Sequence, residues 1–146
     1  MSSHLISRTL KALGIDCLVT TASISNEEEY KKHVKEVNGS ITESDGTKVA
    51  TYADTLSVSY SDFQAKYPEI VASEALDLLR YFRDKKLNEC DWVVTKAQET
   101  GTTISDEWKN YRQALRDLPS SANPKFLDTD EDNLDSTSFT WPTKPS

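Results

Sequence analysis

The most reactive side chains in this sequence belong to two cysteines and two histidines. A nucleophilic cysteine needs a group that stabilises its thiolate, whereas the neighbour of Cys90 is Asp91, whose negative charge disfavours the thiolate. Cys17 and Cys90 lie far apart, and no Gly-rich phosphate loop, GxSxG or HExxH pattern occurs. We therefore predict free thiols in a reducing cytoplasm, no catalytic residues and no cofactor. A small cytosolic enzyme that uses Cys90 with His4 or His33 is kept as the alternative.

An acidic run from Asp128 to Asp132 begins like a calcium-binding loop. Such a loop requires glycine at its sixth position and a bidentate glutamate at its twelfth. Asn133 and Phe139 occupy these positions here. We therefore interpret the run as a solvated turn, and we predict no metal site in the chain.

A third group of residues has the chemistry of protein recognition rather than of catalysis. Aromatic residues and arginine are enriched where protein partners bind each other most tightly. The candidates for partner binding are Trp92, Trp108, Tyr111, Arg112, Arg116, Phe139, Trp141 and Pro142. The alternative for the tryptophans is packing in a small core. The alternative for the two arginines is pairing with Asp106, Glu107 or Asp117 on a solvated helix face.

These candidates need a scaffold, and residues 90–119 predict a helical hairpin. Asp91 is a favourable N-cap for the first helix, and Gly101 can take the left-handed conformation that ends it. Ser105 is the expected N-cap of the second helix, and Pro119 is expected to end it. The second helix carries one apolar stripe at steps of three and four: Trp108, Tyr111, Leu115 and Leu118.

The same stretch resembles a family of small bacteriophage proteins known as tail assembly chaperones or tail fibre assembly proteins. Members show a helix that ends near RD..L...DW, an E-G turn, a W..YRQALRD helix and a closing WP..P. The corresponding segments here are Arg83-Asp84 to Asp91-Trp92, Glu99 to Gly101, Trp108 to Asp117, and Trp141-Pro142 to Pro145. The resemblance covers roughly residues 60–146 and extends to cyanophage-type tail proteins.

This resemblance implies a protein without enzymatic activity that binds a phage tail, fibre or baseplate protein. A second copy of the chain is a further candidate partner. Two roles stay open, an assembly chaperone in the host cytoplasm and a minor structural subunit that remains in the tail of the virion. The resemblance leaves the first 55 residues unexplained.

The composition bears on the class of partner. The formal net charge of −7 opposes binding to a nucleic-acid backbone or to an anionic membrane surface. No long apolar run occurs, so we expect neither a signal peptide nor a membrane span. An acidic adaptor or decoy that mimics nucleic acid is another alternative, but lysines and arginines are interspersed among its carboxylates.

The first 58 residues predict a small α/β piece. Residues 5–13 place apolar side chains on one helical face, and residues 17–21 are rich in β-branched side chains, which favours a strand. A capping-box pattern from Ser25 to Glu28 begins a helix that we expect to run to about Val37.

A hairpin is expected next. Asp45-Gly46 is a turn signal between residues 41–42 and 47–52, and alternation over residues 56–60 predicts a further strand. The N-terminal piece is thus expected to have the order β-α-β-β.

The remaining chain is expected to be helical and then extended. A short helix that breaks at Pro68 precedes a longer one, and a β-hairpin or extended arm with a polar turn at residues 130–133 closes the chain. The predicted class is α+β. The predicted parts are residues 1–58, an attachment piece; 59–119, a helical domain; and 120–146, the arm.

Overall fold

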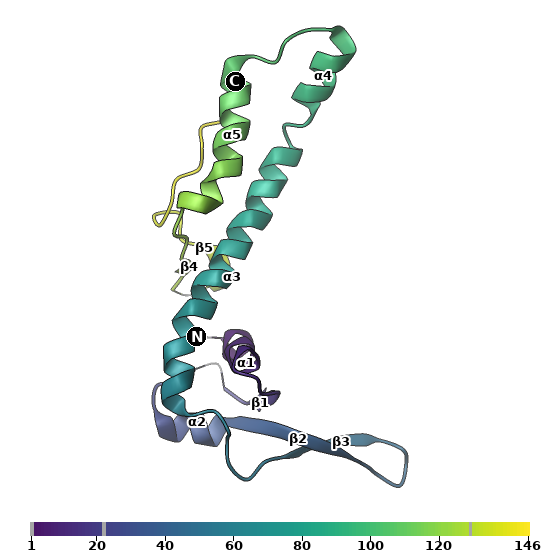
Figure 1. Cartoon of the computed structure of the whole chain (residues 1–146), viewed down its shortest axis with the longest axis vertical. Coiled ribbons are helices and arrows are strands. Elements are labelled where there is room, and N and C mark those ends of the chain that lie inside the picture. Colours follow the sequence, from purple (N-terminus) through teal and green to yellow (C-terminus); the bar gives the residue numbers. More distant parts are fainter. Residues whose placement is uncertain (1, 22, 129) are drawn as a thin grey trace. The chain divides into compact units, whose positions relative to one another are not determined.

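The computed structural model describes residues 2–21, 23–128 and 130–146, and it has the predicted α+β class (Figure 1). Its contacts divide the chain into two compact units, Met1–Val71 and Ala72–Ser146. The division into parts 1–58, 59–119 and 120–146 stays a prediction.

The first unit contains helices and an antiparallel sheet. Its elements are α1 (Ser3–Ala12), β1 (Cys17–Val19), α2 (Glu27–His33), β2 (Val34–Thr42), β3 (Lys48–Tyr52) and the start of α3 (Tyr60–Asn88). The strand order is β1-β2-β3. The β-α-β-β arrangement is therefore confirmed. The hairpin turn is confirmed as well, since the Glu43 N–H donates to the Thr47 carbonyl at 2.8 Å and Gly46 has φ +87°.

The end of α2 differs from the prediction. The helix stops at His33 rather than near Val37, because Val34 pairs with Val19 across the sheet and is almost completely buried there. Burial of a β-branched residue in the sheet outweighs its weak preference for helix. The strand expected over residues 56–60 is also absent, since this described segment is irregular until α3 begins.

The N-terminal cap of α2 lies one residue later than predicted. Asn26 Oδ1 accepts a hydrogen bond from the Glu29 N–H at 2.9 Å. The Glu29 carboxylate in turn accepts from the N–H and the hydroxyl of Ser25, both at 2.8 Å. The reciprocal logic of a capping box is thus present, with the helix beginning at Glu27.

Tyr30 lies at the centre of the core of the first unit. Buried residues of this core are Ile6, Leu10, Ile15, Ile24, Tyr30, Val34, Val58 and Phe63. The Tyr30 hydroxyl donates to the Val58 carbonyl at 2.9 Å. Burial raises the pKa of Tyr30 to about 12, and the negative charges of Cys17, Glu36 and Asp62 add to this effect.

The second unit contains the rest of α3, then α4 (Trp92–Thr100), α5 (Asp106–Ser121) and a hairpin of β4 (Phe126–Leu127) and β5 (Asp130–Leu134). The predicted helical hairpin is therefore confirmed. A closing β-hairpin is present as well, but its turn does not lie at residues 130–133, where it was predicted. Gly101 ends α4 with φ +64°, as its place in the sequence predicts.

Two prolines lie inside helices that they were expected to break or end. The proline at position 68 removes one donor from α3, but Gln64, whose carbonyl would have accepted it, is exposed to water. Pro119 lies in the last turn of α5, which closes with a hydrogen bond from the Ala122 N–H to the Leu118 carbonyl at 2.9 Å.

The acidic residues expected in a turn belong instead to β5. Phe126 pairs with Leu134 and Leu127 with Asp130. Phe139 to Trp141 is not a strand. The Asp130 carboxylate accepts hydrogen bonds from the Asn133 side chain and the Asp132 N–H, which hold the pKa of Asp130 below its usual value. Across the described chain, no group of three or more His, Cys, Asp or Glu is placed to hold a metal ion.

Candidate functional site

The recognition residues of the second unit surround a small core at the corner between α3 and α4. Cys90 and Leu115 are completely buried there, and Tyr111 is 6% exposed. Leu87, Trp108 and Trp141 pack against them. Core packing was the alternative role for Trp92, but its side chain is 53% exposed.

Arg112 ties α5 to this corner. Its Nη1 donates to the Leu87 carbonyl at 3.2 Å and to Cys90 Sγ at 3.0 Å, and its Nη2 donates to Asp91 Oδ1 at 2.8 Å. Burial lowers the pKa of the guanidinium, but the hydrogen bonds to Asp91 and Cys90 outweigh it, so that the pKa is raised overall. The Leu87 carbonyl belongs to the last turn of α3, where a positive charge also complements the helix dipole.

The contacts of Arg112 explain why Asp91 does not cap α4. Asp91 has a helical backbone conformation and makes no capping hydrogen bond, because its carboxylate pairs with Arg112. The cap of α5 also differs from the prediction. Ser105 precedes α5 in an extended conformation but makes no capping bond, and its hydroxyl instead pairs with Glu107 and lowers the pKa of that carboxyl.

Three aromatic side chains, Trp92, Trp108 and Tyr111, make a continuous tract across α4 and α5, which we call the aromatic tract. The ring centroids of Trp92 and Trp108 are 5.8 Å apart, those of Trp108 and Tyr111 are 5.9 Å apart, and both pairs meet edge to face. Lys96 Nζ lies 5.8 Å from the Trp92 ring centroid. The tract therefore runs from a buried end at Tyr111 to an exposed end at Trp92.

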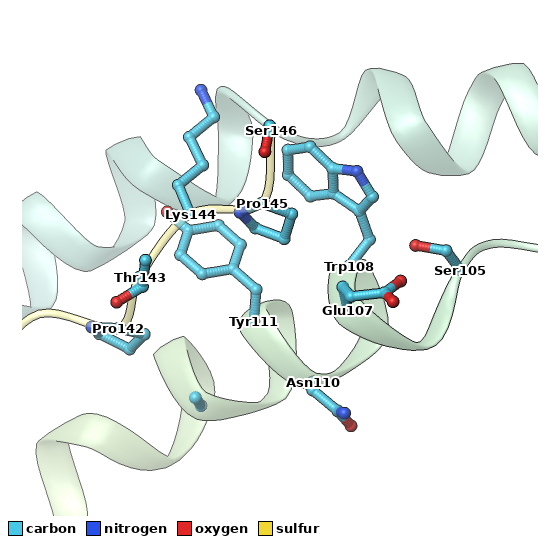
Figure 2. A pocket seen from close by; sticks show the side chains of 11 residues that line it. Ser105, Glu107, Trp108, Asn110, Tyr111, Pro142, Thr143, Lys144, Pro145 and Ser146 are labelled. Carbon is cyan, nitrogen blue, oxygen red and sulfur yellow. The ribbon is translucent and has the colours of Figure 1, made fainter.

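A groove lies over the buried half of the tract (Figure 2). One wall is formed by Ser105 and by α5 residues from Glu107 to Ala114, and the other by the tail, which we define as Pro142 to Ser146. Figure 2 shows the Pro145 ring beside the rings of Tyr111 and Trp108. The space between the two walls measures about 730 Å³ and is open to solvent.

Trp141 leads into the tail and packs on its own unit. Its ring centroid lies 5.2 Å from that of Phe139, edge to face, and Lys86 Nζ lies 4.9 Å from it. Arg116 is exposed, and its carbonyl accepts a hydrogen bond from Arg83 at 3.4 Å. The roles of Phe139, Trp141 and Arg116 in partner binding stay predictions.

The structure adds residues that the sequence alone did not assign to this site. Cys90, Leu87 and Lys86 hold Arg112 and Trp141 in place. The sequence analysis had offered Asp106, Glu107 and Asp117 as partners of the arginines, and it did not single out Asp91, the residue that Arg112 pairs with.

The burial of Cys90 bears on the enzyme alternative. Its thiol has no exposed surface, and it donates to the Leu87 carbonyl at 3.1 Å and accepts from Arg112. His33, a candidate base in that alternative, has its Nδ1 within 3.0 Å of the Thr20 hydroxyl in the first unit. Within the described parts of the chain, no helix is both long enough and apolar enough to cross a membrane.

Residues 76–146 match the family model described as phage tail assembly chaperone protein. The family resemblance of this segment is confirmed. No curated protein and no solved structure matches the chain significantly. The matched segment lies within the second unit and contains the aromatic tract, Arg112 and the tail, whereas the first unit lies outside it. The match supports a role in phage tail assembly.

Proposed function

We propose that the second unit binds a subunit of the phage tail or tail fibre, and that the aromatic tract is its contact surface. The observation that carries the proposal is the exposure of Trp92, 53% of whose surface faces water inside the family segment. A large exposed aromatic residue is typical of a binding hot spot, because its burial against a partner removes much apolar surface from water.

The position of Trp92 supports this role. It begins α4 directly after Asp91, whose carboxylate is held by Arg112, and its ring rests against the edge of Trp108. A side chain held in this way loses little conformational freedom when a partner binds, which favours affinity. The predicted contribution of Arg112 to binding is therefore indirect, through the placement of Trp92.

The chain acts by binding in this proposal, as an assembly chaperone in the host cytoplasm or as a minor subunit of the virion tail. The burial of Cys90 supports binding over the enzyme alternative. The net charge of −7 supports a protein partner over nucleic acid. A baseplate protein, a second copy of the chain and a cyanophage source are further predictions.

The test is co-purification of the full chain with the tail proteins encoded beside it. Trp92→Ala should abolish co-purification and leave the melting temperature nearly unchanged, because its side chain is largely exposed. Tyr81→Ala is the matched control, since Tyr81 is an aromatic residue of the same unit with 54% exposure. Equal recovery of tail proteins by the parent and both variants would reject the aromatic tract as the contact surface.

The same material separates the two roles. Mass spectrometry of purified particles should find the chain if it is a virion subunit and should not find it if it is a chaperone.

A further inference from the structure

The β2-β3 hairpin of the first unit is exposed over most of its length. Every residue from 38 to 49 is exposed, and Figure 1 shows the hairpin extending beyond α2 and β1. β1 pairs with β2 only at Val34 to Glu36, so the outer part of the hairpin has two strands. A two-stranded hairpin alone is marginal in water, so this part of the chain would gain stability from a further strand.

Two hydrogen bonds show which backbone groups of β3 face away from β2. In an antiparallel pair, the N–H and C=O groups of successive residues point alternately to the partner strand and away from it. The Thr47 carbonyl accepts from the Glu43 N–H at 2.8 Å, just before β3 begins, and the Ala53 N–H donates to the Glu36 carbonyl at 2.9 Å, just after it ends. Odd-numbered residues therefore point to β2. The other side of β3, which we call the open edge, presents the backbone groups of Lys48, Ala50 and Tyr52.

The open edge lacks the features that normally prevent strand pairing. Among the described residues, β3 has a strand partner on one side only. Natural proteins protect such an edge with proline, charged side chains or a β-bulge. β3 contains no proline, and its only charged residue, Lys48, is the first. The bulge of this hairpin lies on β2, between Val37 and Gly39, so it disturbs the opposite edge.

We propose that the first unit binds a second copy of the chain through β3, whose open edges pair antiparallel about Ala50. In this register Ala50 lies opposite the other copy's Ala50, and Lys48 lies opposite the other copy's Tyr52. Every N–H of the open edge then donates to a carbonyl of the other copy, because residues paired in this way exchange both hydrogen bonds. The first unit lies outside the family segment, so the inference does not rest on the aromatic tract.

The side chains of β3 complement themselves in this register. Lys48 meets a tyrosine ring rather than a second lysine, and an aromatic ring attracts a lysine that lies over it. The chain already makes such a contact, since Lys85 Nζ lies 4.5 Å from the Tyr81 ring centroid. The smallest side chain of β3, that of Ala50, lies at the two-fold axis, where identical side chains meet. β3 itself thus carries the strand that its open edge accepts.

The same pairing joins exposed apolar surface. Ile41 and Val49 pair across the hairpin and are both exposed. Val49 lies opposite the other copy's Thr51, and opposite residues share one face of a sheet, so the Ile41-Val49 pairs of both copies lie on one face. A strand of five residues buries little surface, so we expect a weak dimer. The net charge of −7 on each copy weakens it further at low salt.

Amide hydrogen exchange of the full chain at low and high protein concentration tests the register, with sedimentation velocity as the measure of dimer. At high concentration the amides of Ala50 and Tyr52 should exchange at least about fivefold more slowly, once most of the chain is dimeric. The amides of Val49 and Thr51 point to β2 and should exchange at the same rate at both concentrations.

Substitutions at the two-fold axis test the hydrogen bonds. Ala50→Pro removes an N–H of the open edge and none that points to β2, and proline is tolerated at such an edge position. Ala50→Ser is the matched control, because it keeps the N–H. We expect the dissociation constant of the dimer to rise at least about tenfold for Ala50→Pro and to stay within about twofold for Ala50→Ser.

A charge exchange keeps the test decisive if Ala50→Pro does not fold. Tyr52→Lys places like charges opposite each other and should weaken the dimer, and addition of Lys48→Glu should restore it. A chain that stays monomeric at every concentration would overturn the proposal. So would a dimer without added protection at Ala50, or one that Tyr52→Lys leaves equally strong. Each of these results leaves co-purification through Trp92 untouched, so the two proposals fail separately.

Discussion

Replacement of Arg112 by methionine should destabilise the second unit by much more than an ordinary helix substitution. Methionine keeps most of the length of the side chain but removes all three hydrogen bonds, to Leu87, Cys90 and Asp91. Because Arg112 is only 9% exposed, water does not replace these bonds fully.

The three bonds do not contribute equally. The Asp91 side chain is 57% exposed and is solvated again when Arg112 is lost, so this ion pair contributes about 0–1 kcal/mol. The Leu87 carbonyl keeps the Cys90 N–H as a partner. What remains is the loss of the buried, charged donor Nη1 of Arg112. A hydrogen bond from such a charged donor contributes about 1.5–3 kcal/mol to stability. We therefore expect a decrease in the free energy of unfolding of about 2 kcal/mol rather than the sum of three full bonds.

Urea unfolding of the full chain measures this decrease. Arg116→Met is the matched control, because Arg116 is exposed one turn further along α5, and it should change the free energy of unfolding by no more than about 0.5 kcal/mol. Asp91→Asn should fall between the two. Equal unfolding midpoints for the Arg112 and Arg116 variants would refute the role of Arg112 as the link between α5 and the corner.

Three further outcomes are expected. Leu115→Ala should lower the free energy of unfolding in urea by about 2–5 kcal/mol, because Leu115 has no exposed surface. Leu127→Ala is the control and should lower it much less, because Leu127 is 40% exposed. Similar decreases for the two variants would contradict the placement of Leu115 in the core. Tyr30→Phe removes the bond to Val58 and should cost about 1 kcal/mol near neutral pH. The pKa of Tyr30 is raised from 10.0 to about 12, so the stability that this shift adds is fully present below pH 10 and is lost as the pH rises towards 12. Between pH 10 and 12 the free energy of unfolding of the parent should therefore fall more steeply than that of Tyr30→Phe. Equal slopes for the two proteins would exclude a raised pKa of Tyr30. Millimolar calcium should not change the melting temperature of the parent, nor that of a variant in which Asp128, Asp130 and Asp132 are replaced by Asn. A rise in the melting temperature of the parent alone would reveal a calcium site.

Local signals predicted much of the fold. The turn at Asp45-Gly46 and the end of α4 at Gly101 depend on backbone conformations that few residues adopt, so sequence identifies them directly. The order of elements and the α+β class followed from such signals and from apolar periodicity.

The wrong predictions concern places where a distant contact outweighs a local preference. Val34 is not part of α2, because it is buried in the sheet beside β1. Asp91 does not cap α4, because its carboxylate accepts a hydrogen bond from Arg112. The two prolines were given too much weight, since an exposed carbonyl or a terminal helix turn tolerates the missing donor.

The candidate site was predictable in its residue types but not in its division of roles. Aromatic residues and arginine marked the correct unit, yet only the fold distinguishes exposed Trp92 from buried Tyr111 and from Arg112 with its internal contacts. Periodicity alone could not do so, because Trp108, Tyr111 and Leu115 share one stripe that runs from the surface into the core.

Photo-crosslinking from the position of Trp92 in the full chain tests directly whether the aromatic tract contacts a tail protein. A photoreactive phenylalanine analogue replaces Trp92, or Tyr81 as the control, while the tail proteins encoded beside it are co-expressed. We expect a crosslink from position 92 to a tail or tail fibre subunit, identified by mass spectrometry, and none to that subunit from position 81. Crosslinks of equal yield from both positions, or none from position 92 while the subunit still co-purifies with the chain, would contradict this contact.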